Sequence, residues 1–120
     1  MPRKTIDFDT VRQFAADLPG VEETTSYGSP ALKAYGKPMA WIPPHKNMEP
    51  GTLVVRVDIE VRAELIEAAP DIYYVTNHYL KYPAVLVRMP RIDLDALKDL
   101  LRMAHSFVKN SSRKTVKKRS

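Results

Sequence analysis

The 120-residue sequence contains no cysteine. This absence excludes disulfides, thiolate metal sites and a cysteine nucleophile, and it fits a protein of a reducing compartment. Long apolar runs are also missing. The longest are a few residues, whereas a membrane-spanning helix needs about 20. The N-terminal Met1-Pro2-Arg3-Lys4 leads into a polar stretch without the apolar segment of a signal peptide. We therefore expect a cytoplasmic protein with no membrane partner.

Motifs that carry catalysis or cofactor binding are missing as well. Neither G-x-x-x-x-G-K, G-x-G-x-x-G nor G-x-S-x-G occurs, so neither a phosphate loop nor a nucleophile elbow is expected. The histidines, at positions 45, 78 and 105, lack the spacing of paired zinc ligands. Glu22-Glu23 has no second acidic cluster with which to form a two-carboxylate site. The sequence thus predicts a non-enzymatic protein with no cofactor and no metal.

Positive charge is concentrated at the C-terminal end of the chain. The net charge is +5, yet residues 1–108 hold 13 cations and 14 anions. Residues 109–120 have no anion and six cations, namely Lys109, Arg113, Lys114, Lys117, Lys118 and Arg119. We expect a single domain over residues 1–108 and a disordered basic tail over residues 109–120. The tail could be a solubilising extension or an arm that binds phosphates through counterion release.

Periodicity predicts the element order helix, three strands, helix, two strands, helix. Each helix begins after an N-cap carboxylate, at Asp7, Asp58 and Asp93. Strands are predicted at residues 31–35, 39–42, 53–57, 72–75 and 84–89. Because short links join sequential strands, the expected fold class is α+β: a two-layer sandwich in which an antiparallel sheet of about five strands has helices on one face.

The details of the first hairpin and of the helices follow from local chemistry. Gly36-Lys37 is predicted to form a type II′ turn, and residues 21–25 a polar connection before the hairpin. On the second helix, a buried stripe is expected from Val61, Leu65, Ile66 and Ala69. On the last helix, an apolar seam is expected from Leu94, Leu97, Leu101, Ala104 and Val108.

The side-chain period of two predicts that the sheet face without helices is cationic. Lys33 and Tyr35 share this face, which also receives Arg56 and Arg88 from later strands. The hairpin loops at residues 35–37 and 43–51 add Lys37 and Lys46. The candidate nucleic-acid-binding residues are therefore Lys33, Tyr35, Lys37, Lys46, Arg56 and Arg88. The cations would contact phosphates, and Tyr35 is the best candidate for stacking on a base. The net charge of −1 over residues 1–108 opposes this interpretation.

Several short motifs, taken in their order and spacing, resemble the MmcQ/YjbR-like proteins over residues 6–108. They are Leu18-Pro19-Gly20-Val21-Glu22, Tyr27-Gly28-Ser29-Pro30-Ala31, Gly36-Lys37, His78-Tyr79-x-x-Tyr82-Pro83 and Val85-Leu86-Val87. The resemblance implies a frataxin/CyaY-like sandwich, sometimes described as carrying a double-wing DNA-binding motif, and many members are labelled DNA-binding. The sequence departs from the family at Tyr27, where Trp is frequent, and at Leu80-Lys81, where the aromatic loop often has a glycine.

Two functional hypotheses follow. The first is a non-enzymatic module that binds DNA weakly and non-specifically through sheet and hairpin-loop cations. The second is a small-ligand-binding protein or a protein–protein adaptor with a pocket near Tyr27, His78 and Tyr82. In that pocket His78 has no adjacent carboxylate or nucleophile, so a hydrogen bond that ties its loop to the backbone explains it better than catalysis does.

Overall fold

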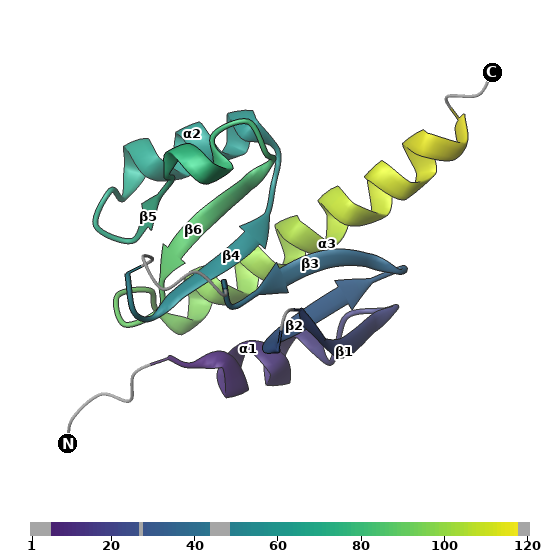
Figure 1. Ribbon diagram of the computed structural model, residues 1–120, viewed down its shortest axis with the longest axis horizontal. Coiled ribbons are helices and arrows are strands. Elements are labelled where there is room, and N and C mark those ends of the chain that lie inside the picture. The colour runs from purple at the N-terminus through teal and green to yellow at the C-terminus, as the bar shows by residue number, and fades with distance from the viewer. Residues whose placement is uncertain (1–5, 27, 44–48, 118–120) are drawn as a thin grey trace.

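The computed structural model describes residues 6–26, 28–43 and 49–117, and Figure 1 shows their arrangement. These residues form an antiparallel six-stranded sheet and three α-helices, which confirms the α+β class and the helix-on-sheet architecture. The strand order is β1-β2-β3-β4-β6-β5. Tyr27 and Lys46, both singled out from the sequence, lie outside the described residues.

The elements follow one another along the chain with short links. They are α1 (Phe8–Ala15), β1 (Val21–Ser26), β2 (Ser29–Ala34), β3 (Lys37–Trp41), β4 (Thr52–Arg56), α2 (Ile59–Ala68), β5 (Tyr73–Tyr74), the 3-10 helix η1 (Asn77–Tyr79), β6 (Ala84–Arg88) and α3 (Leu94–Lys117). The predicted N-caps are confirmed, because carboxylates of Asp7, Asp58 and Asp93 accept backbone N–H bonds at 3.2, 3.0 and 2.8 Å.

Strand β1 corrects the prediction of a polar connection at residues 21–25. It pairs with β2 at all six of its positions, from Val21↔Ala34 to Ser26↔Ser29. As the edge of the sheet, it exposes Glu22, Glu23 and Thr25, so it lacks the apolar alternation that identifies a half-buried strand. Its valine and threonines still favour extended backbone.

The turn between β2 and β3 also differs from the prediction. Ala34 pairs with Lys37, so the turn residues are Tyr35 and Gly36, not Gly36 and Lys37. Their φ angles, 53° and 78°, are both positive, as a type I′ turn requires. A register shift between Leu32 and Lys33 further breaks the alternation of side chains. Tyr35 is therefore not on the predicted open face, because its ring lies against His105 of α3, with 5.4 Å between centroids.

Helices α1 and α3 cover the apolar side of the sheet, as predicted. Buried side chains from both layers form one cluster that includes Val11, Ala15, Leu32, Ala34, Leu53, Val55, Val57, Val85, Val87, Leu97, Leu100, Leu101, Ala104 and Val108. The seam of α3 is thus confirmed except at Leu94, which is 52% exposed. Helix α2 packs Val61, Leu65, Ile66 and Ala69 on the rim of this cluster, where they are only partly buried.

The opposite face of the sheet is covered over β4 and β6, although the sequence predicted it to be open. A second cluster buries Val54 and Leu86 beneath Tyr79 of η1, with Trp41 and Tyr74 partly buried against it. Residues 77–83, which we call the aromatic loop, therefore fold back over β4 and β6. The part of that face formed by β4 and β6 is therefore covered.

Helix α3 continues to Lys117, beyond the predicted end of the domain at residue 108. In Figure 1 its C-terminal part extends past the sheet and away from the rest of the fold. The backbone of residues 109–117 is helical. This extension gives the molecule its elongated shape, with principal extents of 54 × 28 × 28 Å.

Candidate functional site

Arg88, one of the predicted phosphate contacts, is held in contacts within the fold. Its Nε donates to Glu49 Oε2 at 2.8 Å, and its Nη1 donates to the backbone carbonyls of Pro70 and Asp71 at 3.2 and 3.4 Å. The guanidinium also lies 4.2 Å from the ring centroid of Tyr74. Glu49 offsets its charge, so Arg88 joins β6 to the segment before β5 and offers little free positive charge.

Arg56 lies between two aromatic rings. Its Cζ is 4.9 Å from the ring centroid of Tyr82 and 5.2 Å from that of Phe107. Its Nε donates to the Pro83 carbonyl at 3.3 Å, and no residue that the structure describes accepts a hydrogen bond from its Nη atoms. We call this arrangement the Tyr82–Arg56–Phe107 stack. It joins β4, the aromatic loop and α3.

The other predicted cations lie elsewhere. Lys33 is opposite Glu22 of β1, and Lys37 begins β3 opposite Ala34; both are half-buried. In the sheet order, β4 lies between β3 and the strand of Arg88, β6. Of the six predicted contacts, Lys46 lies outside the described residues, and the other five come from β2, the turn after it, β3, β4 and β6.

Arg62 of α2 is a key residue that sequence reasoning missed. It is only 6% exposed, and it donates to four backbone carbonyls of the aromatic loop and β6. The acceptors are the oxygens of Tyr79, Leu80, Tyr82 and Ala84, at 3.2, 2.9, 3.0 and 3.1 Å. Position 62 shares helical spacing with positions 65, 66 and 69 of the predicted stripe, which is the signal that could have revealed it.

The aromatic loop brings together His78 and Tyr82, two members of the predicted ligand pocket, around Tyr79. The His78 and Tyr79 rings make an edge contact at 4.7 Å, and the Tyr79 and Tyr82 centroids are 6.4 Å apart. Tyr82 also meets Trp41 edge-on at 6.3 Å. Burial raises the pKa of Tyr79, an effect that a hydrogen bond with the Trp41 side chain opposes. These contacts are those of a packed aromatic cluster with Tyr82 at its exposed rim.

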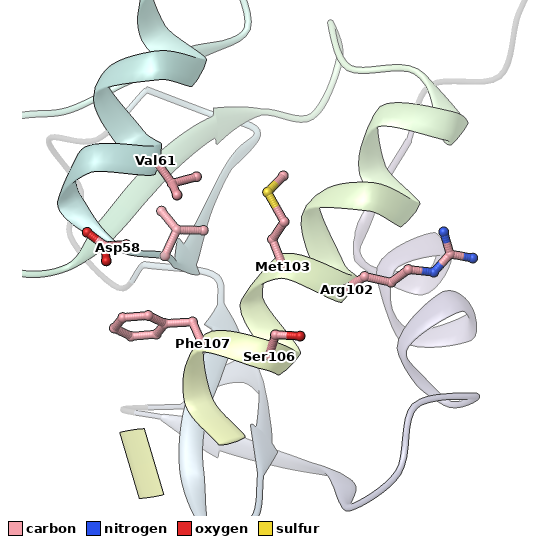
Figure 2. Close-up of a pocket in the computed structure, with 7 residues that line it drawn as sticks. Asp58, Val61, Arg102, Met103, Ser106 and Phe107 are labelled. Carbon is pink, nitrogen blue, oxygen red and sulfur yellow. The ribbon is translucent and has the colours of Figure 1, made fainter. Parts of the chain in front are cut away.

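A groove with a volume of about 360 Å³ lies between the start of α2 and the middle of α3. Figure 2 shows the side chains of Val61 and Met103 pointing toward each other and the Phe107 ring below Asp58, while the guanidinium of Arg102 points away. Its lining consists of Val57, Asp58, Val61, Arg102, Met103, Ser106 and Phe107. Four of these seven side chains are apolar, and the polar Asp58 is used as an N-cap. The sequence signal is the pair at positions 103 and 107, which lies outside the buried seam of α3.

The extension of α3 carries a charge of one sign. Residues 109–117 contain Lys109, Arg113, Lys114 and Lys117 and no acidic residue. Positions four apart differ by about 40° around a helix, so positions 109, 113 and 117 fall on one side of α3. We call residues 109–117 the basic extension. It follows directly after Phe107 and the last buried residue of the seam, Val108.

Among residues 6–26, 28–43 and 49–117, no three His, Cys, Asp or Glu side chains are grouped as metal ligands would be. No helix in the described part of the chain is long and apolar enough to cross a membrane.

Comparison with known proteins places the fold in a family. A family model described as YjbR matches residues 16–107. Protein DR2400 of Deinococcus radiodurans, whose crystal structure contains a DUF419 family-model domain, is similar at 23% identity and a TM-score of 0.71. That match covers 91% of this chain and 83% of the other. No curated protein matches the sequence.

Proposed function

The chain belongs to the YjbR family, and we propose that this member is a non-enzymatic module that binds nucleic acid through its phosphates. The observation that carries the proposal is the basic extension, a stretch of α3 with four cations and no anion that projects from the fold (Figure 1). Cations on a helix that projects from the fold can reach a phosphate backbone without a shaped cleft. Such contacts supply affinity and little base discrimination.

The main phosphate contacts in this proposal are the cations of α3 and not those of the sheet. Over residues 1–108 the formal charges nearly cancel, and a basic face is the expected footprint of a nucleic-acid-binding domain. Arg88 is paired with Glu49, which weakens its attraction for a phosphate. The basic extension has no such compensation in its own sequence, so it is the part of the chain with the strongest attraction for a polyanion.

Deletion of residues 109–120 is expected to flatten the salt dependence of nucleic-acid binding. Each phosphate neutralised on duplex DNA contributes about 0.9 to the slope of log K against log salt. Loss of six cations should therefore reduce the slope by several units. The measurement is fluorescence anisotropy of a labelled duplex over a series of salt concentrations.

The matched controls separate charge from chain length. A K109Q/R113Q/K117Q variant keeps the helix length and should reproduce about half of the change, because it removes three of the six cations. A K81Q/R91Q variant removes exposed cations elsewhere and should change the slope less. If the deletion leaves the slope of the full chain unaltered, the basic extension is not the phosphate-binding element.

The groove between α2 and α3 favours a second candidate function, the binding of a small, largely apolar molecule. Its volume of about 360 Å³ lies within the range of about 300–1,000 Å³ found for ligand sites. We expect anilinonaphthalene sulfonate to fluoresce on binding there, and Met103→Gln to weaken that signal severalfold. Leu94→Gln, which alters an exposed leucine of the same helix, is the control. Equal fluorescence from the two variants would show that the dye does not bind in the groove.

A further inference from the structure

The Tyr82–Arg56–Phe107 stack holds a guanidinium in one orientation with its ends open. The Nε bond to Pro83 and the two rings fix the side chain. Its Nη atoms have no acceptor among the described residues. A planar guanidinium can donate two parallel hydrogen bonds to a phosphate, and a guanidinium that is already fixed loses less freedom on binding than a mobile lysine does.

Tyr82 supplies an aromatic surface beside this cation. Its side chain is 36% exposed, with Arg56 near its ring and Trp41 in edge contact. Its backbone is fixed as well, because Arg62 donates to its carbonyl at 3.0 Å. A partly exposed ring on an anchored backbone, next to an open guanidinium, has the composition of a base-stacking site on a single strand.

The stack and the basic extension are neighbours along α3. Phe107, the third member, is a residue of α3 that precedes Lys109 by two positions. Two positions differ by about 200° around a helix, so positions 109, 113 and 117 lie on another side of α3 from Phe107. Tyr35, the stacking candidate favoured by the sequence, is less suitable, because its ring lies against His105 and directly over the backbone of Gly20.

We propose that the substrate class is single-stranded nucleic acid, with a base stacked on Tyr82 and a neighbouring phosphate bound by the Nη atoms of Arg56. This inference rests on the proposed function and adds the choice of strand. A base in a duplex is stacked on its neighbours and cannot lie on a protein ring, whereas an unpaired base can. Phosphate contacts alone give no such preference.

The test compares three probes on the full chain: a labelled oligothymidine, a duplex with the same number of phosphates, and inorganic polyphosphate. We expect the oligothymidine to bind more tightly than the duplex. Tyr82→Leu should weaken oligothymidine binding about tenfold and leave duplex and polyphosphate binding unchanged. Tyr82→Phe, which keeps the ring, should bind as the unaltered chain does. Arg56→Gln should also weaken oligothymidine binding.

Tyr35→Leu is the matched control, since Tyr35 is similarly exposed at 40% but contacts α3. It should leave binding of all three probes unchanged. Trp41 is the only tryptophan of the chain and touches Tyr82, so its fluorescence should change with oligothymidine and not with polyphosphate. Thermal unfolding confirms that each variant is folded.

The outcomes separate the inference from the proposal beneath it. If Tyr82→Leu binds oligothymidine as tightly as the unaltered chain, while deletion of residues 109–120 still flattens the salt slope, the stacking site is wrong and the phosphate-binding function stands. If the full chain binds none of the three probes, both are wrong. Equal losses from Tyr82→Leu and Tyr35→Leu would also overturn the stacking site.

Discussion

Arg62→Ala is expected to lower the free energy of unfolding by about 3 kcal/mol or more. The guanidinium donates to four carbonyls at 2.9–3.2 Å, and the side chain is 6% exposed. Truncation removes all four bonds. The Tyr79 and Tyr82 carbonyls keep backbone donors, the N–H groups of Tyr82 and Ala84, whereas a buried acceptor left without any donor costs about 1–3 kcal/mol. Chemical denaturation, with the midpoint and slope fitted separately, gives the change.

Two further substitutions define what Arg62 contributes. Arg62→Lys keeps the charge, but a single ammonium cannot reach four carbonyls that a planar fork can, so we expect an intermediate loss. Arg102→Ala removes an exposed arginine of α3 and should change stability by less than about 0.5 kcal/mol. Equal unfolding midpoints for Arg62→Ala and Arg102→Ala would show that the four carbonyls find other partners.

Substitution of Arg62 should also affect the proposed stacking site at Tyr82. Arg62 fixes the backbone of residues 79–84 by its bonds, and Tyr82 lies within that segment. In the Arg62→Lys variant, which should remain folded, the aromatic loop is less firmly held, and Trp41 fluorescence should therefore respond less to oligothymidine. Arg62 of α2 thus contributes both to the stability of the fold and to the position of Tyr82.

Features set by local sequence could be predicted, because the chemistry lies within a few residues. The N-cap carboxylates and most of the α3 seam follow from helical spacing and capping. Strand β1 could not be identified in this way. Its exposed polar residues give no period of two, and its extended conformation depends on pairing with β2.

The face of the sheet shows how one local irregularity displaces a predicted site. A perfect alternation places Lys33 and Tyr35 together. The register shift at Leu32/Lys33 and the positive φ of Tyr35 turn the tyrosine toward His105 instead. Neither the shift nor the turn type follows uniquely from the sequence, since Gly36 is compatible with both type I′ and type II′ turns.

The stack around Arg56 depends on contacts that no local pattern contains. Its members are separated by 26 and 25 residues along the chain, at positions 56, 82 and 107. They meet because α3 crosses the sheet beside β4 and because Arg62 draws the aromatic loop toward α2. The sequence could identify Arg56 and Tyr82 as separate candidates, and it assigned them to different hypotheses. Only the fold brings them into one site.

Leu97→Ala is expected to cost about 2–5 kcal/mol of unfolding free energy. Leu97 is fully buried in the cluster between α3 and the sheet, so its truncation removes apolar contacts and leaves a cavity. Leu101→Ala should lie toward the lower end of that range, because Leu101 borders an existing space of about 160 Å³ between α1 and α3. Side chains around an open space can move inward and reduce the cavity.

Leu94→Ala provides the control on the same helix and with the same chemical change. Leu94 fits the helical spacing of the seam, yet it is 52% exposed, so its truncation should change stability by less than about 0.5 kcal/mol. Urea denaturation of the three variants measures the difference directly. A cost at Leu94 equal to that at Leu97 would mean that α3 packs along its whole seam, as spacing alone predicts. A negligible cost at Leu97 would mean that α3 does not pack on the sheet.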